Sequence, residues 1–210
     1  MNKNYDILQM AKKIFEQESQ ALVNLIDIVG ESFEQVVKLI LGCNGHIIVI
    51  GVGKSGLIGK KMAATLSSLG TPSFFVHGTE AVHGDLGMIK PEDICLLISH
   101  SGETPEIINV FSHIERLGNK VIAITGNANS TIAKKANFHL DTGVKEEADS
   151  RGLAPTTSTL VTLALGDALA LVLADLKEFS SDDFGRFHPG GSIGLSFDFE
   201  RKTGKKGDRS

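Results

Sequence analysis

Apolar side chains recur at helical spacing along the N-terminal part of the chain. Over residues 5–41 they stand three or four positions apart, which is typical of the buried stripe of a helix. The positions are Ile7, Leu8, Ala11, Ile14, Phe15, Leu22, Leu25, Ile26 and Val29. The spacing predicts a long helical arm and a second, short helix at about Phe33–Leu41. Because an apolar stripe must be buried against something, we expect a second copy of the chain to cover the arm.

After the arm, short continuous apolar runs alternate with helical patterns. The runs are β-branched and bounded by turn residues, as buried strands are, and lie at His46–Ile50, Ser73–Val76, Ile94–Ile98, Lys120–Thr125 and Phe138–Asp141. The helical patterns lie at Ser55–Leu69, Pro105–Leu117, Ser130–Ala136 and Thr157–Leu176. This alternation predicts a doubly wound α/β domain: a mostly parallel, five-stranded sheet with helices on both faces.

The chain divides into three parts on this interpretation. Residues 1–44 form the arm, which belongs to the same domain, and residues 45–196 form the domain itself. Residues 197–210 form a basic tail, which holds Arg201, Lys202, Lys205, Lys206 and Arg209. A charge run of this kind is usually a solvated tail rather than a nucleic-acid arm.

The composition limits the classes of partner. Hydrophobic residues make up 41% of the chain and charged residues 22%, so we expect a folded domain. A net charge of -4, one Tyr and no Trp argue against nucleic acid as a partner. No signal peptide and no uncharged apolar run of membrane length is visible, and Cys43 and Cys95 lie apart. We therefore expect no membrane association and a reducing, cytoplasmic location.

Four polar, glycine-rich segments follow the predicted strands. They lie at 51–56, 77–87, 99–104 and 125–127. The carboxyl ends of parallel strands share one edge of the sheet, where ligands bind in such domains. We expect the four segments to meet there and to form the site.

The first of these segments, Gly51-Val-Gly-Lys-Ser-Gly56, matches a dinucleotide-binding fingerprint only by its glycines. The next predicted strand does not end on the acid that would hold the ribose, and residue 48 is Ile where a phosphate loop of nucleotide hydrolases needs Gly. Two interpretations remain open: a small anion site made by Gly53, Lys54 and Ser55 at a helix start, or an ordinary tight turn.

Two further hydroxyl clusters precede predicted helices. Ser99, Ser101 and Thr104 come before Pro105, and Thr156 and Ser158 open the last long helix. One such cluster is more often a helix cap and turn. Three of them at neighbouring sheet ends favour phosphate binding.

Seven segments together resemble the sugar isomerase (SIS) domain of the arabinose 5-phosphate isomerases. They are Gly53-Lys-Ser-Gly56, Gly70-Thr-Pro72, Glu80-Ala-Val-His-Gly-Asp-Leu-Gly-Met88, Ser99-x-Ser-Gly-Glu-Thr104, Leu153-Ala-Pro-Thr-x-Ser-Thr159, Gly166-Asp-Ala-Leu-Ala170 and Asp183-Phe-x-x-x-His-Pro-Gly-Gly191. Two departures stand out. The chain has His77-Gly78-Thr79-Glu80 where the family usually has His-Pro-Gly-Glu, and it stops where most members continue into CBS modules, so it resembles the stand-alone form.

The resemblance implies a flavodoxin-like SIS fold and a defined reaction. The reaction is the reversible interconversion of D-ribulose 5-phosphate and D-arabinose 5-phosphate through an enediol, the entry step to the Kdo sugar of lipopolysaccharide or capsule. The resemblance also implies that no cofactor or metal is required and that the chain forms a homotetramer.

By position, the resemblance assigns catalytic roles to Lys54, Glu106, Glu147 and His188. Lys54 would stabilise negative charge on the enediolate or the phosphate. Glu147 would be the carbon base, with a pKa tuned upward by shielding from water, and Glu146 is its rival. Glu106 is left open between a site residue and an acid that merely favours a helix start.

The histidines divide into two candidate site residues and three structural residues. His188 would open the sugar ring or shuttle protons, and in related enzymes such a residue reaches the site of a neighbouring subunit. His83 would assist substrate binding and proton transfer, or bind an inhibitory metal together with His188. His46, His113 and His139 are interpreted as structural.

Three alternatives remain. The same fold could bind a phosphosugar as a sensor without turning it over. It could isomerise another phosphosugar, such as a hexulose 6-phosphate or sedoheptulose 7-phosphate. An assembly scaffold would leave the hydroxyl-rich segments unexplained.

Overall fold

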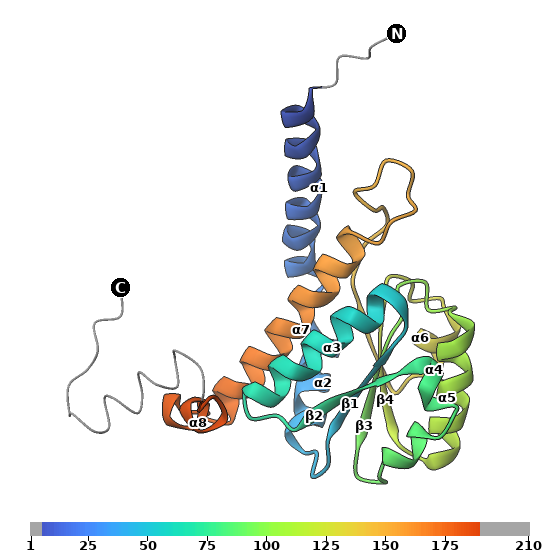
Figure 1. Cartoon of the computed structure of the whole chain (residues 1–210), viewed down its shortest axis with the longest axis vertical. Helices are drawn as coiled ribbons and strands as arrows, with labels where there is room; N and C mark the ends of the chain where they lie inside the picture. The colour runs from blue at the N-terminus through green and yellow to red at the C-terminus, as the bar shows by residue number, and fades with distance from the viewer. Residues whose placement is uncertain (1–5, 190–210) are drawn as a thin grey trace, which may run out of the picture.

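Residues 6–189 are described in the computed structural model of the chain, and a five-stranded parallel sheet lies at their centre. The strands are β1 (Ile47–Gly51), β2 (Ser73–His77), β3 (Ile94–Ile98), β4 (Lys120–Thr125) and β5 (Phe138–Asp141). Their order is β2-β1-β3-β4-β5, and all four pairings are parallel (Figure 1). This is the flavodoxin-like order, so the predicted doubly wound domain is confirmed. The predicted tail at 197–210 lies outside the described residues.

Helices cover both faces of the sheet. On one face lie α2 (Glu31–Leu41), α3 (Gly53–Ser68) and α7 (Thr157–Leu176), and on the other α4 (Gly78–Ala81), α5 (Pro105–Leu117) and α6 (Thr131–Lys135). Alternate residues of a strand point to opposite faces. Thus in β1 Val49 belongs to the core under α3 and α7, whereas Ile48 and Ile50 belong to the core under α5. All five residues of β1 and of β3 are buried, as a parallel sheet covered on both faces requires.

Three short elements were not predicted from the sequence. They are α4, the 3-10 helix η1 (Asp85–Met88) and α8 (Ser181–Phe187). In α4 the ring nitrogen of His77 accepts a hydrogen bond from the Thr79 amide at 3.3 Å, so the loop that departs from the family pattern forms a capped helical turn. In α8 the side chains of Ser180 and Asp183 form a reciprocal capping box.

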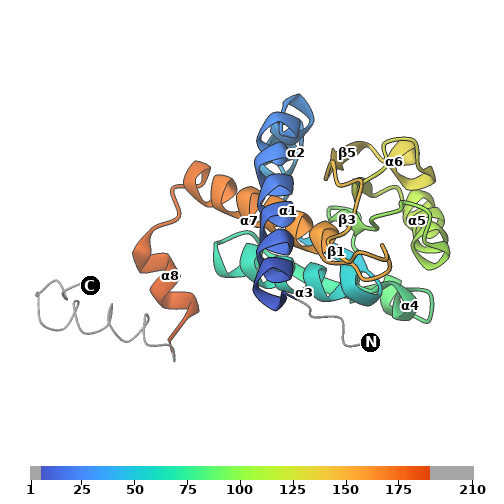
Figure 2. The ribbon, with the colours of Figure 1, turned by 90° about the horizontal axis from the view of Figure 1, so that it is seen from above.

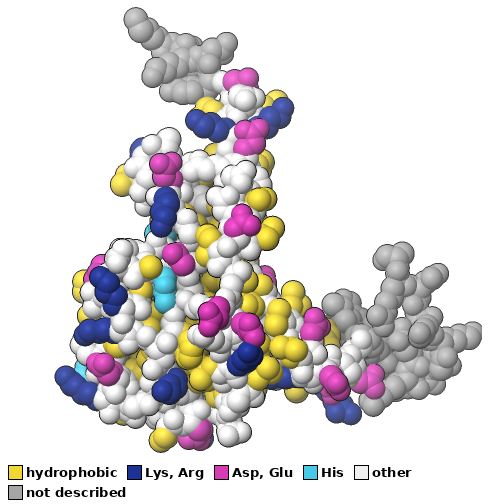
Figure 3. All heavy atoms as spheres, turned by 180° about the vertical axis from the view of Figure 1, so that it is seen from behind, with side chains coloured by type: hydrophobic (Ala, Val, Ile, Leu, Met, Phe, Trp, Pro, Cys, Tyr) yellow, Lys and Arg dark blue, Asp and Glu magenta, His cyan; other side chains and the backbone are white. Residues whose placement is uncertain are grey.

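The arm is the helix α1 (Ile7–Ile28), which projects from the domain (Figures 1 and 2). Leu25 is its one buried side chain, whereas Leu8 and Phe15 are 73% and 68% exposed. Figure 3 shows hydrophobic side chains along this arm. Gly30 ends the arm and precedes α2, which begins at Glu31, two residues before the predicted start.

Among the described residues, one helix, α7, is long and apolar enough by length and composition to cross a membrane. The helix contains Asp167 and Asp175, so it is not an uncharged apolar run and does not contradict the expectation from the sequence. The helix packs against α3 and the sheet, where its buried residues belong to the main core. A core helix of a globular domain passes the same composition test, and the packing of α7 is of that kind.

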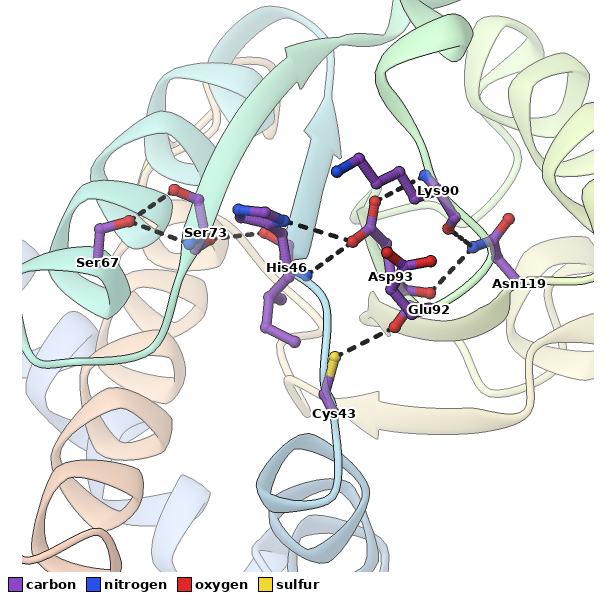
Figure 4. Close-up of polar contacts among 9 residues, drawn as sticks. Cys43, His46, Ser67, Ser73, Lys90, Glu92, Asp93 and Asn119 are labelled. Carbon is purple, nitrogen blue, oxygen red and sulfur yellow. Dashed lines mark hydrogen bonds and ion pairs between the residues drawn. The ribbon is translucent and has the colours of Figure 1, made fainter.

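The amino-terminal edge of the sheet is closed by the buried carboxylate of Asp93 (Figure 4). It accepts hydrogen bonds from the backbone amides of His46 and Lys90, both at 2.7 Å. The His46 ring lies 3.5 Å from the same carboxylate, and the Asn119 amide donates to the carbonyl oxygens of Lys90 and Asp93. These contacts join the starts of β1, β3 and β4, and they show His46 in the structural position that was predicted for it.

Candidate functional site

The carboxyl-terminal edge of the sheet brings three of the predicted segments together. Ser55 on α3, His100 after β3 and Ser158 on α7 line one small hollow, with Thr159 and Thr162 beside them. The hollow has a volume of about 10 Å³, room for no more than a water molecule. The hydroxyl segments therefore converge, but the space for a larger ligand lies on the other side of His100.

That larger space is a cavity of about 990 Å³ between α1 and the 145–155 loop. Met10, Lys13, Ile14 and Gln17 line it from the arm, and His100, Glu147 and the rest of the loop line it from the domain. Figure 1 shows the loop beside the arm, above the carboxyl-terminal edge of the sheet. The side-chain amide of Gln17 donates to the backbone oxygen of Glu147 at 2.9 Å, which ties the arm to the loop.

Glu147 has the most complete hydrogen-bonding environment of the predicted site residues. Its Oε2 accepts hydrogen bonds from the backbone amides of Thr156 at 2.9 Å and Ser158 at 3.1 Å, and from Thr156 Oγ1 at 3.3 Å. The hydroxyl of Ser158 donates to its Oε1. A carboxylate in this position accepts hydrogen bonds from the free amides at the start of α7. Its negative charge is also stabilised by the positive end of the helix dipole.

These contacts correct the expected direction of the Glu147 pKa. Burial raises the pKa of this carboxyl group, but the hydrogen bonds from Ser158 and Thr156 hold it below its ordinary value. Shielding from water alone would raise this pKa, and the donors at the helix start reverse its direction. Glu147 is therefore ionised at neutral pH, the form in which a carboxylate can accept a proton.

The neighbouring loop is held in shape by Asp149, which the sequence analysis did not single out. Its carboxylate accepts hydrogen bonds from the backbone amides of Leu153 at 3.1 Å and Ala154 at 3.0 Å. The bonds from Ala154 and Arg151 lower the pKa of Asp149 to about 2. The signal was available in Asp149-Ser-Arg-Gly152, because an Asp followed by small and Gly residues is typical of a side-chain-capped turn.

The hydroxyls at 99–104 mainly cap their own turn. Ser99 Oγ lies 2.8 Å from Thr104 Oγ1 and accepts from the Gly102 amide at 3.1 Å, whereas Ser101 is exposed and accepts from the Glu103 amide. The Glu103 carboxylate accepts from the Thr131 amide at 2.7 Å, which joins this turn to α6 and lowers the pKa of Glu103. Ser99 thus stabilises the 99–104 turn. The hydroxyl of Ser101 is exposed at the carboxyl-terminal edge of the sheet.

Lys54 and Glu106 lie exposed in the first turns of α3 and α5. Gly53 precedes Lys54 with a φ of +55°, a left-handed conformation that Gly adopts without steric cost. Neither charged side chain has a hydrogen bond to Glu147 within the described residues. The chain presents them on the same edge of the sheet, directed to solvent.

The two candidate histidines lie apart within one chain. His188 follows α8, where its ring stacks on Phe184 with centroids 3.9 Å apart and its Nδ1 lies 2.8 Å from the Phe184 oxygen. The 20 residues of α7, about 30 Å of helix, separate this end from Ser158 and Glu147. His83 is exposed between α4 and η1, and Figures 1 and 2 show α4 far from α8. One chain therefore does not bring His83 and His188 together.

Comparisons with known proteins match the domain to a family. Residues 40–172 match the model of the SIS domain. The chain is 52% identical over 194 residues to a probable arabinose 5-phosphate isomerase of Haemophilus influenzae, covering 92% of this chain and 58% of that protein. It is 48% identical to arabinose 5-phosphate isomerase KpsF of Escherichia coli, covering 90% of this chain and 58% of that protein. The chain thus spans less than two thirds of the length of these curated relatives.

Solved structures share the fold over nearly their full lengths. An Escherichia coli CFT073 protein in complex with arabinose 5-phosphate superposes with a TM-score of 0.86 at 46% identity, covering 90% of this chain and 100% of that one. A putative phosphosugar isomerase involved in capsule formation from Bacteroides fragilis gives a TM-score of 0.84 at 36% identity, covering 88% of this chain and 98% of that one.

Proposed function

The chain belongs to the SIS domain family, and on that premise we propose that it interconverts D-ribulose 5-phosphate and D-arabinose 5-phosphate. The observation that carries the proposal is the position of Glu147. Its ionised carboxylate lies at the start of α7, on the wall of a cavity large enough for a pentose phosphate. The names of the relatives and the arabinose 5-phosphate complex of the structural neighbour support this substrate.

The reaction needs a base, a stabiliser of negative charge and a phosphate clamp. Glu147 would remove the proton from C2 of the aldose and return it to C1 through an enediol. Lys54 would stabilise the negative charge that develops, because an ammonium group near the oxygens opposes its build-up. Glu106 would act beside it on the same edge of the sheet.

The hydroxyl segments would hold the phosphate and the sugar hydroxyls. Helix starts offer free amides and a favourable dipole to an anion, and three helices begin near this edge. The proposed binding residues are Gly53, Ser55, Ser99, Ser101, Thr104, Thr156, Ser158 and His83. Thr156 and Ser158 also hold Glu147, so substrate binding and the position of the base are linked.

We propose that His188 acts in the site of a second copy. The site is incomplete within one chain, because His188 lies at the opposite end of α7. The exposed apolar face of α1 supports self-association, and a homotetramer is the proposed assembly. We also propose that the arm at 1–44 forms one domain with residues 45–196. An inhibitory metal could be bound by His83 and His188 together only if the two histidines come from different subunits.

The product would enter synthesis of Kdo for lipopolysaccharide or capsule, in the cytoplasm. This proposal depends on arabinose 5-phosphate being a substrate of the chain, and it is wrong if the chain does not act on that sugar. Direct comparison of arabinose 5-phosphate with a hexulose 6-phosphate and sedoheptulose 7-phosphate would identify the substrate among the alternatives.

The test is isomerisation in deuterated water. We expect the purified chain to convert arabinose 5-phosphate to the ketose and to incorporate deuterium at C2 of the recovered aldose. Glu147→Gln should lower both signals by about 10²–10⁴-fold, as loss of a general base does. Lys54→Ala should lower turnover by about 10²-fold or more. Lys60→Ala, an exposed lysine on the same helix, is the control and should keep the wild-type rate.

Binding without turnover would contradict the isomerase. If arabinose 5-phosphate binds to the wild-type chain but neither signal exceeds that of Glu147→Gln, the chain is a sugar-phosphate sensor.

A further inference from the structure

His100 occupies a fixed position between the two spaces of the site. It follows β3, and its carbonyl oxygen accepts a hydrogen bond from the Gly126 amide at 2.8 Å. Its ring packs directly on Gly126: a Cβ at that position would lie 2.4 Å from Cε1 and 2.7 Å from Nδ1 of the ring. A side chain at residue 126 would therefore displace the imidazole, and the glycine leaves room for it.

His100 lines both spaces of the site. It lines the large cavity together with Glu147, and it lines the small hollow together with Ser55 and Ser158. A side chain in this position can reach a sugar in the cavity while a phosphate is held by the hydroxyl segments.

The two ring nitrogens have different surroundings. Nδ1 is buried and has no hydrogen-bond partner among the described residues, whereas Nε2 is not buried in this way. A buried polar atom without a partner requires an explanation, and a buried N–H without an acceptor is rarer than a lone pair without a donor. This favours the tautomer with its proton on Nε2, the nitrogen that remains accessible to a ligand.

We propose that His100 is a further catalytic residue, whose Nε2–H exchanges protons with O1 and O2 of the sugar while Glu147 moves the proton between C2 and C1. The inference rests on the isomerase function proposed above and assigns a second group to it. A neutral imidazole that donates to a carbonyl oxygen has a precedent in triosephosphate isomerase, which catalyses the same type of reaction.

The step balances without another reactant. Glu147 takes the proton from C2, the C2–H electron pair forms the C1–C2 double bond, and O1 takes the Nε2 proton. The ring then takes the proton of the O2 hydroxyl as the C2 carbonyl forms, and Glu147 returns its proton to C1. Hydrogen has moved from C2 to C1 and from O2 to O1, and both side chains have returned to their initial states.

The test compares His100→Asn and His100→Gln with His113→Asn, a histidine on α5 outside the site. We expect both His100 variants to lose about 10²-fold or more in kcat for arabinose 5-phosphate, as loss of a proton-transfer group does. KM should change by less than about 3-fold, because the interaction belongs to the transition state rather than to binding. Calorimetric binding of inorganic phosphate should remain, and His113→Asn should match the wild type in every measurement.

Gly126→Ala supplies an independent variant, because it displaces the ring while His100 is retained. Like the His100 variants, Gly126→Ala should lower kcat.

Three results would overturn the proposal. Wild-type kcat in the His100 variants would remove the ring from the reaction. An increase in KM with unchanged kcat would make His100 a binding residue only. A wild-type chain without any isomerase activity would contradict the proposed function itself, and the role of His100 with it.

Discussion

At the scale of single residues, Glu147 combines a structural contact with a chemical position. The hydrogen bonds from Thr156 and Ser158 stabilise the start of α7, and Glu147 also lines the large cavity. For catalysis the donors must share the carboxylate with the substrate, since a carboxylate has several acceptor positions. As the proposed base, Glu147 would be oriented before the sugar arrives, which favours transfer of a proton at a defined carbon.

The lowered pKa of Glu147 predicts a pH-dependent contribution to stability. The contribution is present above the value near 4.5 expected in the unfolded chain and is lost as the pH falls through the lower pKa of the folded state. Glu147→Gln should therefore cost about 1 kcal/mol of unfolding free energy at pH 7, as loss of a helix cap does. The difference from wild type should shrink as the pH falls below 4.5.

Urea unfolding at pH 7 and in the acid range measures this difference. Glu146→Gln is the matched control, because Glu146 is exposed and has no hydrogen bond among the described residues. A wild-type to Glu147→Gln difference that stays constant over the acid range would show that the ionised carboxylate does not stabilise α7.

The sequence predicted some of the site residues and could not have predicted others. Ser55 and Ser158 were identified by the repeated hydroxyl pattern, and the position of Glu147 came from the family resemblance. Single-chain spacing gave no signal for His100, because the position of its ring depends on Gly126 after the next strand. The direction of the Glu147 pKa also required the structure, since its donors lie nine and eleven residues away along the chain.

At the scale of helices and strands, the periodic pattern was most informative where elements are long or fully buried. The predicted strand His46–Ile50 begins one residue before the observed Ile47–Gly51, and the helix Pro105–Leu117 is the same in both. The missed elements α4, η1 and α8 have only four to seven residues. Such lengths give too few periods to distinguish a helix from a turn, and in α4 and α8 a side-chain capping contact fixes the start of the helix instead.

The contact between α3 and α7 predicts the effect of a larger side chain at Gly166. A Cβ at this position would lie 2.4 Å from the Met62 Cε and 2.8 Å from its Cγ, an atom close to the α3 backbone, so Gly166→Val would force the two helices to repack. We expect a loss of about 1–3 kcal/mol in the free energy of unfolding, as overpacking of a core costs. The measurement is urea unfolding of the purified variant.

Ala168→Val is the control for the substitution at Gly166. Ala168 is exposed on the same helix, so the added methyl groups meet solvent rather than α3. Equal stability of the two variants would show that close packing at Gly166 does not hold α7 against α3.

At the scale of the whole molecule, the arm connects the candidate site to the proposed self-association. The exposed apolar side chains of α1 extend away from the domain, while Gln17 on the same helix binds the backbone of Glu147. A second copy packed on the arm would therefore bury its apolar face and fix the cavity wall at the same time. The sequence indicated the unpaired stripe but not this connection, because the contact between Gln17 and Glu147 spans 130 positions.

Charged substitutions on the arm test this connection. Leu8→Lys combined with Phe15→Lys should weaken self-association, because two ammonium groups would have to be buried in the interface. Sedimentation velocity should show a smaller species than the wild type, and isomerase activity should fall with it. Glu16→Lys, on the exposed surface of the same helix, should leave both unchanged. A wild-type chain that is monomeric at the assay concentration would contradict the assembly.

The most direct measurement is a crystal structure of the chain with arabinose 5-phosphate bound. We expect the sugar in the cavity between α1 and the 145–155 loop, with C2 about 3–3.5 Å from a Glu147 carboxylate oxygen, the separation at which a proton can be transferred. The phosphate should contact the hydroxyl segments beside Ser55 and Ser158. A sugar bound outside this cavity, with Glu147 in contact only with the start of α7, would contradict the account.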